Sequence, residues 1–522
     1  MRIGRGCHVV TRLAPLGLII ALGLQGVARA DAASDAALQK QVQDLQTEIQ
    51  ELKGEINTIK ANSVVQAPAA PPAGSTAAAP APATVGQHVG AIEKDVADIK
   101  TNLSTNLGVH IHGLVDVPYE YNLNQPNTSG GSKGGVNSSS PGGSVNQLRV
   151  FDTEGSGFNL QQFNLHLDRT SDGGVGFVTE LNFGQVANVL RASTRESNIN
   201  PGTTSNDVID LTQAYMTYTV PVGSGIALQL GRFVTLLGAE VIPTYSTYGS
   251  ADYNISRSFI FGFGIPFTHT GLRGTYNFNQ FLGLTLGVNN GWDDVTDNND
   301  GQTFEGQLSL SSGDRMTHNQ SLALTLSSTY GPEQVNRGSS RRWEIDPVLT
   351  YKTPIKGLQL IGEYLYAQET GPVSISPAFN SHGNPLCAVV PGNFCAPAPG
   401  FSAGPNGTIL HPHAVSWNGA DAYIVYDLTD NLEFALRGEY FEDPNGARTG
   451  LPQLLGEGTG TINYKIPAVT GLLARLEYRH DESNKKPFFN DTVFGPTSIL
   501  AGLPNHTRAG QDTFIADAIY SF

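Results

Sequence analysis

From Gly108 to the C-terminus, segments with period-two hydrophobicity are joined by connectors that are short and long in turn. We predict sixteen strands, at 108–123, 158–170, 175–185, 209–221, 226–235, 258–278, 282–293, 302–313, 320–330, 341–353, 358–369, 416–428, 432–443, 459–468, 472–483 and 511–522. The short connectors are 171–174, 222–225, 279–281, 314–319, 354–357, 429–431 and 469–471, and the long ones include 124–157, 186–208, 236–257, 370–415 and 484–510. Short turns at one end and long loops at the other are typical of outer-membrane barrels. The fold class that we predict for 108–522 is all-β, a transmembrane antiparallel β-barrel of about sixteen strands, with eighteen as the alternative count.

Alternation within the strands favours a membrane barrel over a soluble sandwich. In 472–483, Arg475, Glu477 and Arg479 share one face while Leu476 and Tyr478 share the other. The last strand carries aromatic and small residues on one face and ends in Tyr520-Ser521-Phe522. A terminal Phe on such a strand resembles the signal that the barrel-assembly machinery reads. We therefore predict Tyr520 and Phe522 as a C-terminal assembly signal, and outer-membrane lipid around the barrel.

The first thirty residues predict export. A basic start, an apolar run from Leu13 to Leu24 and the small-x-small site Ala28-Arg29-Ala30 form a secretory signal peptide over 1–30. The apolar run is shorter than the ~20 residues that a membrane-spanning helix needs. A retained N-terminal anchor is the alternative.

Two helical segments precede the predicted barrel. Apolar residues with 4-3 spacing predict a coiled coil over 31–62, at Leu38, Val42, Leu45, Ile49, Leu52, Ile56 and Ile59. An Ala/Pro-rich linker follows at 63–84, and a second short coiled-coil segment at 85–107 has the same spacing. The choice of seam residues leans towards dimers, over only three heptads, and a single helix docked on another surface is the alternative. We expect these segments to lie in the periplasm and to space or oligomerise the barrel, with a homotrimer favoured.

Charge and cysteine content exclude some functions. The formal net charge is −15, and it becomes −19 when the four arginines of the signal peptide are removed. Nucleic acid is therefore not an expected partner, because binding it needs a basic surface. The mature chain has two cysteines, Cys387 and Cys395, which we expect to form a disulfide that closes a small loop.

One stretch carries a family resemblance. The residues from Gly231 to Glu240 read GRFVTLLGAE, and they are followed by Asn254–Phe259 (NISRSF), by Ile265–Arg273 (IPFTHTGLR) and by Asn289–Asp293 (NNGWD). Together they resemble the OmpL-like β-barrel porin family, best over about 230–295 and more loosely over the rest of 108–522. The resemblance implies a water-filled channel for passive diffusion of small hydrophilic solutes or ions, without a cofactor, and it leaves the solute open. Phosphate-selective porins are a more distant likeness, and the barrel has only six lysines where those channels use many.

In general porins the third long loop folds into the lumen, and by analogy we expect the third long loop of this chain, 236–257, to do the same. It holds Glu240, Asp252 and Arg257. Opposed acids and arginines across a narrow passage filter solutes by charge. We therefore predict a constriction or pore lining formed by these three residues with further charged residues of the wall, namely Arg232, Arg437, Arg475, Glu477 and Arg479. The alternative is that these residues form ion pairs that stiffen the wall.

Other chemistry is less well supported. His110 and His112 share a strand face with Asp116 but show no third ligand at a suitable spacing, so polar lumen lining is preferred over a metal site. His411 and His413 lie in an external loop, and the acidic run 293–300 is expected to be a solvated turn rather than a calcium site.

The rival classes are an enzyme and a tether. No G-x-S-x-G motif is present, and Ser258 and His269 show no orienting partner, so we do not expect an enzyme. A structural envelope tether, in which the barrel only anchors the coiled coil, remains the alternative function.

Overall fold

The computed structural model describes residues 108–124, 146–153, 155–169, 174–193, 209–242, 252–313, 321–334, 336–371, 373–375, 402–403, 409–411, 413–485, 487–489 and 507–522. The predicted signal peptide, both coiled-coil segments, the linker and the predicted disulfide of Cys387 and Cys395 lie outside these residues. No helix among the described residues is long and apolar enough to cross a membrane.

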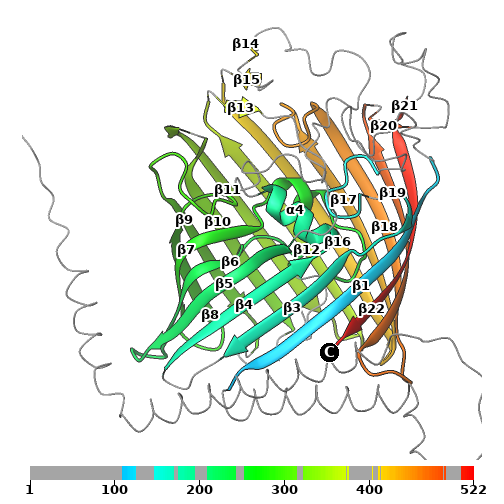
Figure 1. The fold of residues 1–522 in the computed structure, drawn as a ribbon, viewed down its shortest axis with the longest axis horizontal. Coiled ribbons are helices and arrows are strands. Elements are labelled where there is room, and N and C mark those ends of the chain that lie inside the picture. The colour runs from blue at the N-terminus through cyan, green and yellow to red at the C-terminus, as the bar shows by residue number, and fades with distance from the viewer. Residues whose placement is uncertain are drawn as a thin grey trace, which may run out of the picture. The chain divides into compact units, whose positions relative to one another are not determined.

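Sixteen antiparallel strands form one closed barrel (Figure 1). In chain order they are β1 (His110–Asn122), β3 (Gln162–Arg169), β4 (Val175–Phe183), β5 (Ile209–Val220), β6 (Ile226–Val234), β7 (Thr268–Asn277), β8 (Leu282–Asn289), β9 (Thr303–Ser311), β10 (Leu322–Gln334), β11 (Arg337–Lys352), β12 (Leu358–Glu369), β16 (Val415–Thr429), β17 (Leu432–Asp443), β18 (Gln453–Lys465), β19 (Leu472–Ser483) and β22 (Gly510–Ser521). Each strand pairs with its neighbours in sequence, and β22 pairs with β1 from Leu114↔Ser521 to Asn122↔Thr513. The predicted fold and the count of sixteen are therefore confirmed.

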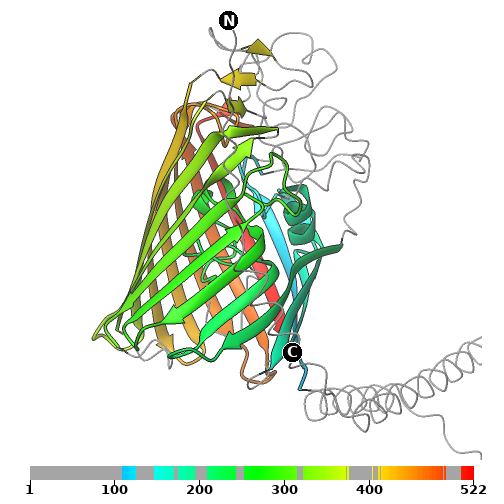
Figure 2. The same cartoon turned by 90° about the vertical axis from the view of Figure 1, so that its left-hand side faces the viewer.

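Six short strands lie outside this sequence of sixteen. Strand β2 (Ser156–Phe158) lengthens the pairing with β1, and the loops contain β13 (Val373–Ile375), β14 (Ser402–Ala403), β15 (Ile409–His411), β20 (Phe488–Phe489) and β21 (Thr507–Arg508). Figure 2 shows the strands strongly tilted, with the short turns at one end of the barrel and the loops at the other. We call these the turn end and the loop end.

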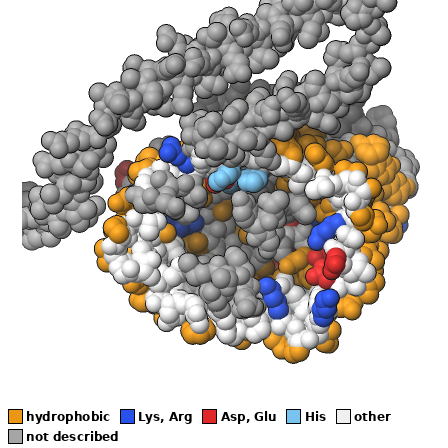
Figure 3. Space-filling model, turned by 90° about the horizontal axis from the view of Figure 1, so that it is seen from below, with side chains coloured by type: hydrophobic (Ala, Val, Ile, Leu, Met, Phe, Trp, Pro, Cys, Tyr) orange, Lys and Arg blue, Asp and Glu red, His pale blue; other side chains and the backbone are white. Residues whose placement is uncertain are grey.

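The two faces of the wall differ in polarity in the sense that a membrane barrel requires. On β19, Arg475, Glu477 and Arg479 are buried in the interior, whereas Leu476 and Tyr478 are exposed on the outside. Exposed aromatic residues lie towards the loop end, as Tyr440, Tyr478 and Phe514, and towards the turn end, as Phe281, Tyr464 and Tyr520. This is the apolar band with aromatic girdles of an outer-membrane barrel. The end-on view of Figure 3 likewise shows most hydrophobic side chains at the outer edge.

One predicted strand is wrong in its first half. The range 258–278 contains a π-helix, η3 (Ile260–Gly264), and only 268–277 form strand β7. Phe259, Phe261 and Phe263 alternate as a strand would, but Ile260 between them is also buried, because the segment is surrounded by other inward-folded chain. Smaller shifts occur at β18, which begins at Gln453 rather than at 459, and after β4, where α4 (Gln185–Ser193) begins the predicted loop 186–208.

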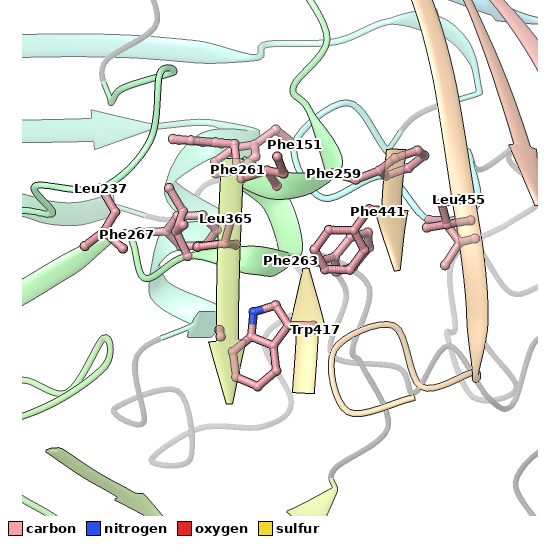
Figure 4. Close-up of a cluster of buried hydrophobic side chains, with 14 of the residues drawn as sticks. Phe151, Leu237, Phe259, Phe261, Phe263, Phe267, Leu365, Trp417, Phe441 and Leu455 are labelled. Atoms are coloured by element: carbon pink, nitrogen blue, oxygen red, sulfur yellow. The ribbon is translucent and has the colours of Figure 1, made fainter. Parts of the chain in front are cut away.

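Three segments fold into the barrel and share an apolar core. They are the inner segment (146–153), helix α4 and the inner loop (235–267, described except for 243–251). Their contacts include Phe151 against Phe261 and Phe267, with ring centroids 5.4 and 5.2 Å apart. Wall residues complete the cluster, notably Leu365, Trp417 and Phe441 (Figure 4). The lumen of the barrel is thus partly filled by a packed apolar cluster.

Candidate functional site

An arginine of the barrel wall binds Glu240, an acidic side chain of the inner loop. Arg437 on β17 lies with Nη1 2.5 Å from Glu240 Oε1 and with Nε 2.5 Å from Glu457 Oε1 on β18. The same guanidinium donates to the carbonyl oxygen of Ser256 at 2.8 Å. Arg437 is 3% exposed and Glu240 is 4% exposed, so water screens this contact weakly.

Two further arginines, both on β19, bind the backbone of the inner loop. Arg475 pairs with Asp517 at 2.8 Å and donates to the carbonyl oxygens of Asp252 and Asn254 at 3.3 and 3.4 Å. Arg479 pairs with Asp481 at 2.7 Å and donates to the carbonyl oxygen of Arg257. Each guanidinium group therefore binds a carboxylate of the barrel wall and a backbone carbonyl oxygen of the inner loop.

Wall carboxylates accept the backbone N–H groups of the same stretch. Glu477 accepts from Ile255 and Ser256 at 2.5 and 2.9 Å. Glu439 accepts from Phe259 and Ile260 at 2.7 and 2.6 Å, at the start of η3. Together with the arginines, these carboxylates satisfy the irregular backbone of 252–260, which has no strand partner.

Seven of the eight predicted pore residues therefore lie together at one contact between the inner loop and the wall. The loop itself contributes Glu240, Asp252 and Arg257, and Arg257 contacts Asp252 and lies 3.9 Å from Glu240. The eighth residue, Arg232, is elsewhere: it pairs with Asp210 on β5 at 3.4 Å and donates to the carbonyl oxygen of Leu211. These charged side chains form direct ion pairs and hydrogen bonds. This agrees with the alternative interpretation, in which ion pairs stiffen the wall.

Sequence reasoning missed partners that complete this contact. Glu457 lies before the predicted start of the strand at 459, yet it points inward from β18. Arg149 of the inner segment donates from Nε to Asp481 Oδ2 at 2.8 Å and contacts Asp152. The strand parity of Asp481 was visible in the sequence, whereas the return of 146–153 into the lumen had no signal.

The first residues of the inner loop are held on a different part of the wall. Asp346 on β11 accepts from the N–H of Gly238 at 2.5 Å, and Glu363 on β12 accepts from Ala239 at 2.9 Å. Tyr423 on β16 donates to Glu240 at 3.2 Å. The inner loop thus follows the wall from β11 to β19.

A loop-end contact fastens the other end of η3. Arg448, in the connector between β17 and β18, donates to the carbonyl oxygen of Phe263 at 2.5 Å. Its guanidinium carbon lies 4.6 Å from the ring centroid of Trp292, and that of Arg342 lies 4.5 Å from the same ring. Burial and the neighbouring Arg342 lower the pKa of Arg448 to about 10, so it remains protonated near neutral pH.

The sequence predicted a solvated turn for the acidic run 293–300, but two of its side chains are buried in the structure. Asp293 and Asp294 are 4% and 3% exposed, and Asp293 accepts from the N–H groups of Phe267 and Thr268 at 2.7 and 2.9 Å. Its carboxylate therefore orients the junction between the inner loop and β7. Among the described residues, no group of three His, Cys, Asp or Glu side chains is placed to hold a metal ion.

The histidine and serine that were considered for an enzyme lie in structural roles. His269 is buried, and its ring nitrogens contact the carbonyl oxygen of Gly291 at 3.1 Å and Thr235 Oγ1 at 3.3 Å. Ser258 Oγ accepts from the N–H of Phe261 at 3.0 Å, at the start of η3. Neither contact forms a nucleophile–base pair.

Comparison with solved structures finds outer-membrane channels at low identity. The outer membrane channel DcaP of Acinetobacter baumannii has a TM-score of 0.44 at 10% identity, with 79% of this chain and 97% of that chain covered. An anion-selective porin from Comamonas acidovorans has a TM-score of 0.43 at 10% identity, with 79% and 99% covered. OprB of Pseudomonas putida has a TM-score of 0.45 at 10% identity, with 82% and 97% covered. Among curated protein sequences, none matches this chain.

The family comparison covers the whole barrel. The model described as "Putative beta-barrel porin-2, OmpL-like" matches residues 108–522, which include all sixteen strands, the inner segment and the inner loop. The match extends well beyond 230–295, where the sequence resemblance was best. The chain therefore belongs to the OmpL-like family of outer-membrane β-barrel porins.

Proposed function

We propose that this porin lets small hydrophilic solutes or ions cross the outer membrane by passive diffusion through its water-filled lumen. One observation carries the proposal: the closed wall turns charged side chains such as Arg475 and Glu477 inward and apolar ones such as Leu476 outward. In porins a polar interior of this kind surrounds a water-filled channel. The family to which the chain belongs supports the same function.

The inner loop and its contact with the wall form the proposed constriction. The residues assigned to this pore lining are Glu240, Asp252, Arg257, Arg232, Arg437, Arg475, Glu477 and Arg479. Because seven of them fasten the loop, we assign them the role of setting the width and the field of the passage through the position of the loop. Arg232 contributes charge from its own place at Asp210.

The remaining features belong to envelope assembly. Tyr520 and Phe522 serve as the signal read by the barrel-assembly machinery, and the exposed apolar band meets outer-membrane lipid. We further propose that residues 31–62 and 85–107 form a periplasmic coiled coil that supports a homo-oligomer, with a trimer favoured, and that Cys387 and Cys395 form a disulfide that closes a small loop. The protein is not an enzyme and needs no cofactor.

A liposome-swelling assay tests the transport function. Proteoliposomes with purified protein should swell in isotonic solutions of small sugars and should stay stable in solutions of large dextrans. Swelling absent from vesicles that contain folded, protease-protected barrel would contradict the porin function and favour the tether. Ester hydrolysis that a single Ser→Ala change removes would favour an enzyme instead.

A further inference from the structure

Three histidines gather on the inner face of the barrel at its turn end. His110 and His112 lie on β1 and His166 lies on β3, and the strand register places His112 directly opposite His166. Their inward direction follows from strand parity, because Asp116 on the same face of β1 is 1% exposed and interior. Figure 3, which looks onto this end, shows histidine side chains reaching the surface inside the apolar edge.

A carboxylate lies between two of these imidazoles. Asp168 is directly opposite His110, and its Oδ2 lies 3.4 Å from His110 Nδ1. Its other oxygen, Oδ1, lies 3.9 Å from His166 Nε2 and has no hydrogen-bond partner. The side chains of His110, His166 and Asp168 are 47%, 23% and 14% exposed, so an ion in the mouth of the barrel can reach them.

These separations are close to those between the ligands of one zinc ion. With zinc–ligand bonds of about 2.1 Å, neighbouring donors of a tetrahedral site are about 3.4 Å apart. His112 adds a fourth donor, with its ring centroid 6.4 Å from that of His166. Glu180 of β4 lies 3.8 Å from His166 Nδ1, on the side away from Asp168, where a carboxylate orients a metal-binding imidazole.

The donors approach one another in pairs and do not yet surround one point. With the side chains in their present positions, no group of three His, Cys, Asp or Glu among the described residues is placed to hold a metal ion. Metal binding therefore requires side chains to turn, and His110, whose side chain is 47% exposed, is free to do so. This points to an exchangeable site at the mouth, open to water, rather than to a permanent structural metal.

We propose that His110, His112, His166 and Asp168 bind a first-row transition-metal dication such as Zn²⁺ at the turn-end mouth of the porin. Imidazole nitrogen suits these metals, whereas Mg²⁺ prefers oxygen ligands. The bound ion adds positive charge to the mouth of the barrel and narrows the opening. The narrowing of the passage rests on the proposed channel function. The cross-strand histidine supplies the third ligand that the sequence of β1 alone did not show.

Calorimetric titration of the purified full-length protein, free of any polyhistidine tag, tests the binding. ZnCl₂ should give saturable binding, and MgCl₂ should give none. His166→Ala should weaken Zn²⁺ binding by at least about tenfold. The matched control is His480→Ala, because His480 is on the outward face of β19 beside Asp512 and should leave the affinity unchanged. No saturable Zn²⁺ binding, or equal binding by His166→Ala, would overturn the proposal.

A second variant with a folding control, and a conductance measurement, accompany the titration. His112→Ala serves as a second variant, and both variants should retain the heat-modifiable migration of a folded barrel. In planar bilayers, Zn²⁺ should lower the current of the wild type and of His480→Ala but not that of His166→Ala. A protein that binds Zn²⁺ but never conducts would contradict the channel function and leave the site intact. Binding without any change in current would overturn only the proposed narrowing of the mouth.

Discussion

Arg437 of β17 lies 2.5 Å from Glu240 of the inner loop, and both side chains are buried. This pair joins two segments almost two hundred positions apart and fixes the loop against the wall. Removal of one partner from a buried pair leaves a charge uncompensated, which costs about 3–5 kcal/mol.

Arg437→Gln should release the inner loop from the wall. Glu240 and Glu457 would both lose their shortest ion pair, so we expect a higher and noisier single-channel conductance and an unfolding temperature lowered by several degrees in heat-modifiability gels. Glu240→Gln combined with Arg437→Gln should recover part of the loss, because the buried charge is removed together with its partner. Equal conductance in Arg437→Gln and the wild type would contradict the assigned role of the pair.

Glu477→Ala should loosen the loop through its backbone. The N–H groups of Ile255 and Ser256 would lose their acceptor, at a cost of about 1–3 kcal/mol for each buried group. Limited proteolysis of the folded protein should then cut within the inner loop. Glu482→Ala is the matched control, because Glu482 lies on the same strand with its side chain exposed on the outside. Similar proteolysis of both variants would show that Glu477 does not hold the loop.

Replacement of Arg475 should shift ion selectivity. Arg475→Gln leaves Asp517 without its partner at 2.8 Å, so the interior gains negative charge. The reversal potential in a KCl gradient should move towards cation preference. Lys356→Gln, in an exposed turn, should leave the reversal potential unchanged. A shift of the same size in both variants would mean that Arg475 acts only through net charge.

The C-terminal residue should matter for closure as well as for recognition. The backbone of Phe522 exchanges hydrogen bonds with Gly113 at 3.0 and 3.1 Å, and a side chain at Gly113 would collide with the Phe522 ring. Phe522→Ala should reduce the amount of heat-modifiable barrel in the outer membrane. Phe514→Ala, which removes a similarly exposed aromatic from the same strand, should have a smaller effect. Equal loss in both variants would assign the effect to general apolar area.

The strands were predictable because membrane and lumen impose opposite polarities on alternate residues. Each of the sixteen predicted strands has its counterpart, and the wall charges of β17 and β19 were identified by parity alone. The inward-folded segments were not predictable in this way. Phe259, Phe261 and Phe263 imitate a strand while they pack in an interior cluster, and nothing in the composition of 146–153 marks its return to the lumen. The candidate residues were found, but their direct pairing depends on where the loop lies.

Single-channel recording of the purified wild-type protein in a planar bilayer tests the central claim most directly. A porin with a polar lumen predicts discrete conductance steps that grow in proportion to the salt concentration. A bilayer that stays electrically silent, although gel migration and protease protection show inserted, folded barrel, would contradict the account.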